Sequence, residues 1–411
     1  NFVGTTVSSS MPTYAANTNK LNSSHVSADW NVWYKSISTV NYALHYIPDV
    51  QGLTAIKKDN YLAEAYFLRA FCYFNLARIW GNVPLVEKPT LSLADVEKPT
   101  QSPQSQVLDL VGKDLEEAVK LVDEGQNDVF RFNPGALYAL YTDYAMWMRD
   151  YDKAILYSGK LMDLKRYSLL KGTEFAQVCA DGTTSENIWT MKWSYQNNKQ
   201  NWIIYMMCRT AAPQMIPSEG VKNLWNTEEY RVDLRRYQTI DTTIVYASNH
   251  ISSPNGDASI WKWQPGERVI EANEKYVPFY RYADILLLRA EALNKQQRQE
   301  EALELLNMIR ERAGLSLKTM DDFTNASDRT LAIEDAILQE RQLELLGEGR
   351  RWFDLIRTGR AMKVMNDYFE NYIEAQTGDV CPRFTDEWQL YWPVYYNNIL
   401  ENANLVQNGN Y

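Results

Sequence analysis

The sequence is poor in histidine and cysteine, and it has no excess of positive charge. It contains 3 His and 4 Cys in 411 residues, and its net charge is −10. Three scattered histidines (His25, His45 and His250) form no convincing catalytic triad, and no GxSxG motif is present. An acidic chain does not neutralise a phosphate backbone, so nucleic acid is excluded as a partner, and polybasic contact with anionic lipid is disfavoured.

Other familiar signals are also missing. No run of about 18 apolar residues occurs, so no transmembrane helix is predicted. The chain lacks the GxxxxGK[ST], GxGxxG, HExxH and EF-hand patterns. The acidic residues Asp321, Asp322 and Asp328 lack the glycine and final glutamate of a calcium loop, and we interpret them as a solvated loop between helices. No cofactor is therefore predicted; a structural calcium ion is left open, but no spacing signals one.

The four cysteines are far apart and include no CxxC pair: Cys72, Cys179, Cys208 and Cys381. Their spacing argues against a disulfide framework and leaves the redox compartment open. Cys72 lies on an apolar helix face and is interpreted as a small buried hydrophobic residue.

What the chain does have is an unusual number of aromatic residues. It contains 27 Tyr, 13 Trp and 12 Phe, while its hydrophobic content of 45% and charged content of 23% are ordinary for a globular protein. A chain of this length exceeds what one simple core holds, since single cores stop growing near about 250–300 residues. Two lobes, or a repeat array with additions, are therefore expected.

Helical spacing of apolar residues appears in several stretches. A helix is predicted from about Trp30, and a second one with a broad apolar face runs from Tyr61 to Ile79. Ser102-Pro103 and Asn133-Pro134 each combine a capping side chain with proline, which predicts two helix starts. The residues before Trp30 are rich in Ser, Thr and Asn and are predicted to form an extended loop.

Two parts of the sequence predict helix pairs of the tetratricopeptide kind. Helices at 134–148 and 153–164 flank a DYDKA turn, with Ala154 small enough for a close helix crossing, although Thr142 replaces the usual glycine. Ala290 and Ala302 repeat the 12-residue spacing of the two crossing positions later in the chain, and Gly314 ends that pair. The two regions share one register, so an array interrupted in sequence is predicted to be continuous in space.

The interruption, residues 170–272, differs from the helical regions in composition and in the spacing of its apolar residues. Six of the thirteen tryptophans lie there, in short aromatic and β-branched stretches such as NIWTMKW, WIIYMM and SIWKW, which predict short strands or loops. The predicted fold class is mainly α, a tetratricopeptide-like helix-pair scaffold with a large irregular insertion of loops and short strands. We predict one domain, 1–411, divided into an N-terminal loop 1–29, helix pairs 30–169, the insertion 170–272, helix pairs 273–360 and a C-terminal segment 361–411.

Aromatic rings and amides together suit carbohydrate, because a planar ring stacks on the C–H face of a pyranose while amides bond its hydroxyls. The run KWSYQNNKQNW around Trp193 has this mixture. A core in which aromatic residues pack between strands explains the same residues, and both interpretations stay open.

Most carboxylates lie near Lys or Arg on helices, and we interpret Glu340 and Glu344 as surface or inter-helix pairs. The run GEGRRWFDLIR is interpreted as structural salt bridges, with Arg350 and Arg351 near Glu344.

Several segments together resemble the SusD/RagB family. They are AEAYFLRAFCYFNLARIWGNVPLV, RYADILLLRAEAL, ALELLNMIRERAGL, AILQERQLELLGEGRRWFDLIRTGR and the tail LYWPVYYNNILENANLVQNGNY. The run from Glu348 to Arg357 is the most specific. In the tail, Trp392 and Ala403 depart from the family pattern.

The resemblance implies an α-α superhelix of the SusD type, with an irregular face that carries the ligand site. It also implies a non-enzymatic protein, lipid-anchored on the cell-surface side of the outer membrane, that binds oligosaccharide and acts as a lid on a SusC-like TonB-dependent transporter. The sequence shows no N-terminal Cys. We therefore expect the signal peptide and the lipidated Cys to lie outside it.

We predict the ligand site where the N-terminal loop meets the insertion. Its predicted residues are Tyr14, Asn17, Trp30, Trp193, Tyr195, Asn198, Trp202, Trp261 and Trp263. Two other functions are kept as alternatives. A tetratricopeptide adaptor would bind peptide in a concave groove, and a glycoside hydrolase would need two carboxylates about 5–9.5 Å apart in the aromatic cleft.

Overall fold

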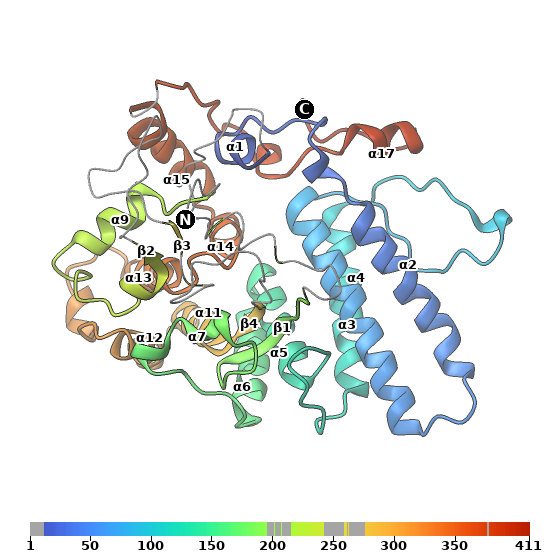
Figure 1. The fold of residues 1–411 in the computed structure, drawn as a ribbon, viewed down its shortest axis with the longest axis horizontal. Helices are drawn as coiled ribbons and strands as arrows, with labels where there is room; N and C mark the ends of the chain where they lie inside the picture. The colour runs from blue at the N-terminus through green and yellow to red at the C-terminus, as the bar shows by residue number, and fades with distance from the viewer. Residues whose placement is uncertain are drawn as a thin grey trace.

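The computed structural model describes residues 12–194, 201, 207, 215–241, 259–260, 262, 276–375 and 378–411. It is mainly helical, which confirms the predicted fold class. The longer helices are α2 (Asn31–Tyr46), α3 (Ala55–Trp80), α4 (Gln104–Leu121), α5 (Pro134–Trp147), α6 (Tyr151–Asp163), α11 (Tyr282–Lys295), α12 (Gln299–Arg312) and α13 (Arg329–Glu344). Figure 1 shows α2, α3 and α4 at one end of the molecule and α12 and α13 toward the other.

The helix pairs form one continuous array, as the sequence predicts. Helix α11 packs against both α5 and α6, although the insertion separates them in sequence. Ala290 and Ala302 are completely buried, and their small side chains let α11 and α12 approach closely. Thr142 is also fully buried, and its hydroxyl donates to the Tyr138 carbonyl at 2.7 Å. That bond satisfies the hydroxyl and explains why threonine is accepted at this crossing.

The two predicted helix starts have different outcomes. Asn133 is the N-cap of α5, as predicted, because its side-chain oxygen accepts from the Ala136 amide at 3.0 Å. The cap predicted at Ser102 is wrong, since Pro103 is the N-cap of α4. The Ser102 amide is used in a bridge to the Val83 carbonyl at 3.0 Å.

The N-terminal segment is less extended than predicted. Its described part contains the short helix α1 (Pro12–Asn17) and a 3₁₀ turn, Val26–Ala28. The C-terminal third adds α14 (Arg351–Arg357), α15 (Ala361–Tyr368), a π-helical turn at Phe369–Glu374 and α17 (Tyr396–Glu401). Figure 1 shows α1 beside the C-terminal part of the chain.

The described part of the insertion consists of short elements, in agreement with the prediction. Strand β1 (Asn187–Met191) pairs antiparallel with β4 (Val277–Arg281), and β2 (Ile240–Asp241) pairs antiparallel with β3 (Ser259–Ile260). Three short helices accompany them: α7 (Gln177–Ala180), α9 (Glu219–Asn226) and α10 (Arg236–Thr239).

Two insertion tryptophans belong to the interior. Trp189 packs on Phe67, Phe71 and Phe279 with ring centroids 4.5–5.0 Å apart. Trp225 is 1% exposed, and its indole N–H donates to Asp233 at 3.1 Å. For these two residues the interpretation as core is correct.

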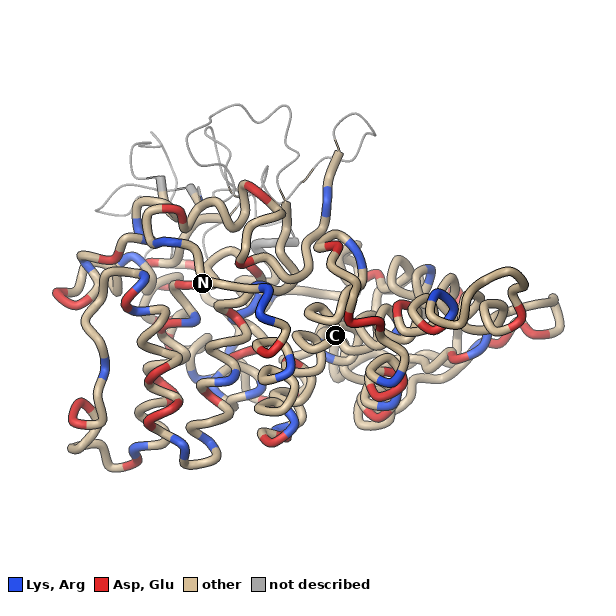
Figure 2. Tube along the Cα trace, turned by 90° about the horizontal axis from the view of Figure 1, so that it is seen from below, with Lys and Arg blue, Asp and Glu red and all other residues tan. Residues whose placement is uncertain are grey.

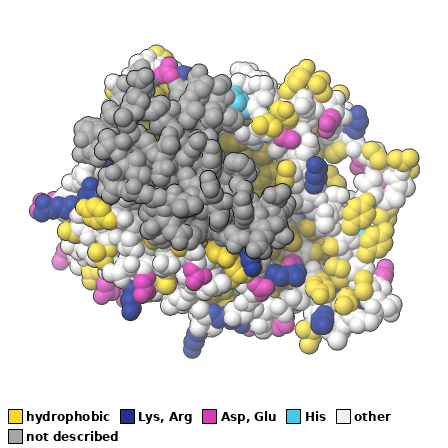
Figure 3. Space-filling model, viewed as in Figure 1, with side chains coloured by type: hydrophobic (Ala, Val, Ile, Leu, Met, Phe, Trp, Pro, Cys, Tyr) yellow, Lys and Arg dark blue, Asp and Glu magenta, His cyan; other side chains and the backbone are white. Residues whose placement is uncertain are grey.

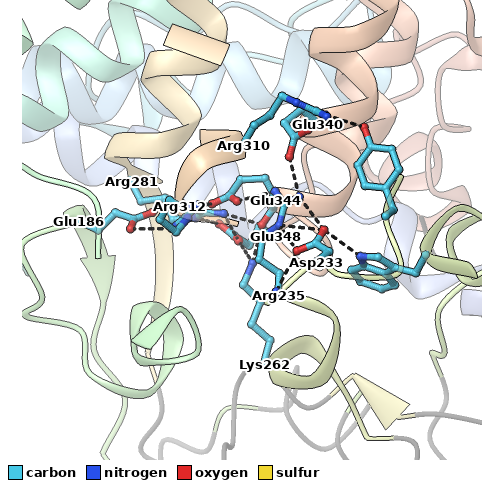
Figure 4. Close-up of polar contacts among 12 residues, drawn as sticks. Glu186, Asp233, Arg235, Lys262, Arg281, Arg310, Arg312, Glu340, Glu344 and Glu348 are labelled. Atoms are coloured by element: carbon cyan, nitrogen blue, oxygen red, sulfur yellow. Dashed lines mark hydrogen bonds and ion pairs between the residues drawn. The ribbon is translucent and has the colours of Figure 1, made fainter. Parts of the chain in front are cut away.

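A buried network of ion pairs fastens the insertion to the helix array (Figure 4). The insertion contributes Glu186, Asp233, Arg235 and Lys262, and the scaffold contributes Arg281, Arg310, Arg312, Glu340, Glu344 and Glu348. Arg235 and Glu344 are both fully buried, with Nη1 of the arginine 3.0 Å from Oε2 of the glutamate. Such charges persist in an interior only when they are paired.

This network corrects part of the sequence interpretation. Glu340 and Glu344 are completely buried, so they are not surface residues, although they do join helices. Glu344 is paired with arginines of the insertion, α12 and β4 instead of with Arg350 or Arg351. Arg350 contacts Asp143 and Asp284. The run GEGRRWFDLIR is therefore structural, as predicted, but with other partners.

Three cysteines are buried and form no disulfide: Cys72, Cys179 and Cys381. Cys208 lies outside the described residues. Asp328 caps α13 and Asp322 belongs to a 3₁₀ turn, which agrees with a loop between helices. Within the described ranges, no helix has the length and apolar character needed to span a membrane.

Candidate functional site

A cavity of about 380 Å³ lies where the N-terminal segment, the α13–α14 turn and the C-terminal tail meet. Its size falls within the range of ordinary ligand pockets. The lining residues are Ala16, Asn17, Asn19, Leu21, Met215, Leu345, Gly347, Gly349, Arg350, Arg351, Trp352, Leu355, Met365, Phe384, Gln389, Leu390, Trp392 and Tyr411. We refer to it as the tail cavity.

The aromatic side of the tail cavity is assembled from two parts of the sequence. Trp352 comes from the first turn of α14 and packs on Phe384 with ring centroids 5.9 Å apart. Trp392 comes from the tail, where its amide donates to the Ile79 carbonyl at 2.7 Å. Asn408 fixes the same segment by donating to the Trp392 carbonyl at 2.6 Å. Trp392 is therefore held by backbone hydrogen bonds, and Trp352 by its packing on Phe384.

The turn between α13 and α14 brings its side chains to the cavity through two glycines. Gly347 and Gly349 have φ values of 92° and 74°, a region that side-chain-bearing residues rarely adopt. Helix α14 is then tied to α13, because the Asp354 carboxylate contacts Arg341 at 2.9 Å and Arg357 at 2.6 Å. Burial alone would raise the pKa of Asp354, but these two guanidiniums outweigh burial and lower the pKa to about 2.

Three amide side chains supply uncharged polar groups to the lining. Asn19 donates to the Pro382 carbonyl at 3.1 Å, and the side-chain oxygen of Gln389 accepts from the Asp386 amide at 2.9 Å. The amide nitrogen of Asn17 is buried, and within the described part of the chain it has no hydrogen-bond partner. A buried donor without a partner is costly, and Asn17 is the residue of the described lining that carries such a donor.

Of the predicted site residues that the structure describes, Asn17 is the one that lines this cavity. Trp30 was predicted as a ligand residue, and the structure corrects this, since Trp30 is only 3% exposed. It packs edge-on against Trp80 at 5.9 Å, and Trp80 packs edge-on against Trp392 at 6.1 Å. Trp30 therefore supports the cavity wall from behind, because a residue at the start of α2 is covered by the end of α3.

The remaining predicted residues are not brought into the described lining. Trp193 follows β1 and is partly buried, with an indole N–H that is buried and lacks a partner among the described residues. The side chain of Tyr14, on α1, lies outside the described residues, as do Tyr195, Asn198, Trp202, Trp261 and Trp263. For Trp193 and these residues the predicted role stays a prediction.

Sequence reasoning missed Trp352, Trp392, Gln389 and Tyr411. A usable signal was present, because the tail LYWPVYYNN has the same mixture of aromatic and amide residues as the run around Trp193. That tail resembles the ending of the SusD/RagB family and Trp352 lies in an ionic run, so neither is predicted from sequence to bind a ligand.

A larger groove of about 590 Å³ lies between α9, α13 and α15. Its lining among the described residues includes Gln339, Arg351, Arg360 and Lys363, but no aromatic side chain. It therefore lacks a surface on which a sugar ring stacks, and the smaller tail cavity is the better candidate. In the described ranges, no group of three or more His, Cys, Asp or Glu side chains is placed to hold a metal ion.

Comparison with known proteins gives consistent results. Residues 188–411 match the model of the SusD family, and residues 3–142 match a family described as starch-binding and associating with the outer membrane. SusD-like protein P38 of Formosa agariphila is 29% identical over 92% of this chain and 78% of its own length. A SusD-like protein of Bacteroides ovatus is 24% identical over 84% of this chain and 68% of its own length.

Solved structures share the fold. A SusD superfamily protein from Parabacteroides distasonis has a TM-score of 0.81 at 21% identity, over 100% of this chain and 91% of that one. A laminarin-binding SusD-like protein has a TM-score of 0.78 at 22% identity, over 99% and 91% of the two chains.

Proposed function

The chain belongs to the SusD family, and from this membership we propose that the protein is a non-catalytic glycan-binding subunit of an outer-membrane importer. It captures an oligosaccharide and delivers it to a SusC-like TonB-dependent transporter. The observation that carries the proposal is the tail cavity, in which aromatic rings and amides line a space of ligand size. A laminarin-binding protein with the same fold supports carbohydrate as the ligand class.

The lining suits a sugar ring. Trp352, Trp392 and Tyr411 offer planar or amphipathic side chains for the apolar C–H face of a pyranose. The unpartnered amide of Asn17 donates to a hydroxyl or ring oxygen, which gives the ligand an orientation. Because this donor has no other described partner, its bond to a ligand is not offset by the loss of an internal bond.

The same lining argues against hydrolysis of the bound sugar. Glycoside hydrolases of the usual kind place two carboxylic acids on either side of the scissile bond. Among the described residues that line the tail cavity there is no Asp and no Glu. Binding without chemistry is therefore the function that this lining supports.

The location proposed for the protein is the cell-surface side of the outer membrane, held by a lipid anchor. The match of residues 3–142 to a family associating with the outer membrane supports this location.

A protein partner is supported by apolar side chains that are more than half exposed near α2, α17 and the segment between α3 and α4. They are Val26, Val32, Leu91, Leu93, Val96, Tyr396, Leu400 and Val406. Figure 3 shows hydrophobic side chains on this end of the molecule, and apolar surface of this kind is typical of interfaces.

Titration calorimetry against a panel of neutral, uronate-bearing and sulfated polysaccharides tests the proposal. We expect binding of at least one glycan, with no release of reducing ends. Trp352→Ala should weaken binding by about 1–3 kcal/mol, the usual contribution of a stacking ring with its buried area. Asn17→Ala should weaken binding by about 1 kcal/mol. Leu331→Ala, on an exposed side chain of α13 outside the lining, is the matched control and should bind as the unchanged protein does.

The triple variant with alanine at Trp193, Trp202 and Trp263 tests the insertion separately. If the triple variant loses binding while Trp352→Ala and Asn17→Ala keep it, the site lies at the insertion and the tail cavity is the wrong place. If no glycan of the panel binds, carbohydrate capture is the wrong function. Release of reducing ends by the purified protein would instead establish an enzyme.

A further inference from the structure

The charge of the tail cavity differs from that of the whole molecule. The chain carries a net charge of −10, and Figure 2 shows acidic and basic residues intermixed along the helices. In contrast, the charged residues in the described lining are Arg350 and Arg351, without an acidic one. A cavity with two guanidiniums and no carboxylate favours a ligand of negative charge.

The two arginines are not equivalent. Arg350 is already neutralised, with its Nε 3.2 Å from Asp284 and its Nη1 3.4 Å from Asp143. Arg351 lines both the tail cavity and the larger groove between α9, α13 and α15, where Asp335 is also part of the lining. Its Nη1 donates to the carbonyl of Leu338, a residue of that groove, at 3.0 Å. No carboxylate of the described residues lies within 4 Å of the Arg351 guanidinium. One hydrogen bond to a carbonyl leaves most of the five N–H donors of this group unused.

The carboxylate that follows Arg351 on α14 is not free to neutralise it. Asp354 is held by Arg341 at 2.9 Å and by Arg357 at 2.6 Å. Burial lowers the pKa of Arg351 to about 10, which still leaves the guanidinium protonated at neutral pH. Arg351 is therefore a partly buried cation that lines the cavity, and among the described residues no carboxylate is in direct contact with it.

We propose that Arg351 is a specificity-determining residue that binds an anionic substituent of the captured glycan, a uronate carboxylate or a sulfate ester. The inference rests on the proposed function and narrows its substrate class from glycans in general to acidic ones. The geometry of a guanidinium fits both substituents, because its parallel N–H groups pair with two oxygens of a carboxylate or a sulfate. The sugar ring stacks on the aromatic side chains beside it, and Asn17 bonds a hydroxyl.

The test uses glycans that share one backbone and differ only in charge. Laminarin and amylose are each prepared in three forms: unmodified, oxidised at C6 to the carboxylate, and sulfated. Calorimetry with the unchanged protein should show an anionic form binding about tenfold or more tightly than its neutral parent, the gain expected from one charge-assisted hydrogen bond. The oxidised and sulfated forms separate the carboxylate from the sulfate as the preferred substituent.

Arg351→Gln removes the charge and keeps an N–H donor for the Leu338 carbonyl. It should abolish the preference for the anionic form while binding the neutral form as before. The matched control is Arg360→Gln, which removes the same charge from an arginine that pairs with Glu334 and Asp335 and lies outside the tail cavity. It should keep the preference. Should Arg351→Gln fail to fold, Arg351→Lys keeps the charge without the planar fork and should retain part of the preference.

The possible outcomes separate this inference from the proposed function. Equal binding of neutral and anionic forms overturns the role of Arg351 and leaves glycan capture intact. An equal loss of preference in Arg351→Gln and Arg360→Gln also overturns it, because net charge would then explain the effect. Absence of binding to every form and to the wider panel overturns the proposed function and this inference together.

Discussion

The Glu344→Gln substitution removes one negative charge from the buried network and changes the size of the side chain very little. Glu344 is completely buried, and its carboxylate lies 3.0 Å from Arg235 and 2.6 Å from Arg312. It also contacts Arg281. Burial alone would raise the pKa of Glu344, but the neighbouring guanidiniums outweigh burial and hold that pKa well below its usual value.

The expected loss of stability follows from these contacts. Three buried guanidiniums share the Glu344 carboxylate, so the variant leaves them short of a counter-charge. Removing one partner of a buried ion pair costs about 3–5 kcal/mol. The glutamine amide keeps one oxygen acceptor, which places the expectation at the lower end, about 3 kcal/mol. Since whole domains are stable by only about 5–15 kcal/mol, urea unfolding followed by circular dichroism should detect the change as a clearly lower midpoint.

Glu301→Gln is the matched control for this experiment. Glu301 pairs with Arg298 at 2.6 Å on the surface of α12, where both side chains are nearly half exposed. Exposed pairs add little to stability, so this variant should unfold at the same urea concentration as the unchanged protein. If Glu344→Gln unfolds together with the control, the network does not hold the insertion to the scaffold and the reasoning is refuted.

Two further predictions concern stability. Because the pKa of Asp354 falls from 3.8 to about 2 on folding, its ionised form contributes about 2 kcal/mol above pH 4. This contribution should disappear as the pH falls from about 4 to about 2. The difference in urea midpoint between the unchanged protein and Asp354→Asn should therefore shrink over the same pH range. A difference that stays constant would contradict the lowered pKa of Asp354. Gly172→Ala should destabilise the fold, because its Cβ would lie 2.2 Å from the Arg312 carbonyl oxygen, a backbone atom that cannot turn away. Gly220→Ala, whose Cβ would have no atom closer than 3.8 Å, should be neutral or stabilising, and equal effects of the two alanines on thermal unfolding would count against the close approach.

The helix array could be predicted because its determinants are local. Alanine at fixed spacing, as at Ala290 and Ala302, permits a close crossing wherever the pair occurs in the chain. The capping bond at Asn133 likewise involves residues three positions apart. Ser102 shows the limit of this reasoning, since its amide is taken by Val83 from a different part of the chain. A contact of that kind changes the local preference without any trace in the local sequence.

The tail cavity could not be predicted for the same physical reason. Asn17, Trp352 and Trp392 meet there from opposite ends of the sequence, and periodicity says nothing about such meetings. Composition was also insufficient to distinguish an aromatic core from an aromatic surface. Trp189 and Trp193 belong to one short run, yet Trp189 is 8% exposed within the main core while Trp193 is only partly buried.

The spacing of Glu340, Glu344 and Glu348 indicates by itself that cations from other parts of the chain cover these side chains. Glu340 and Glu344 lie on α13, and Glu348 lies in the turn that follows it. Like charges four residues apart on a helix repel one another, so this group is unfavourable unless cations from elsewhere cover it. In the structure, arginines and a lysine from the insertion, β4 and α12 pair with these three glutamates. The turn that contains Glu348 leads directly into α14, whose residues Arg351 and Trp352 line the tail cavity. The charges that hold the insertion in place therefore also fix the side of the tail cavity formed by α14. Glu344→Gln should accordingly weaken glycan binding, although Glu344 does not line the cavity.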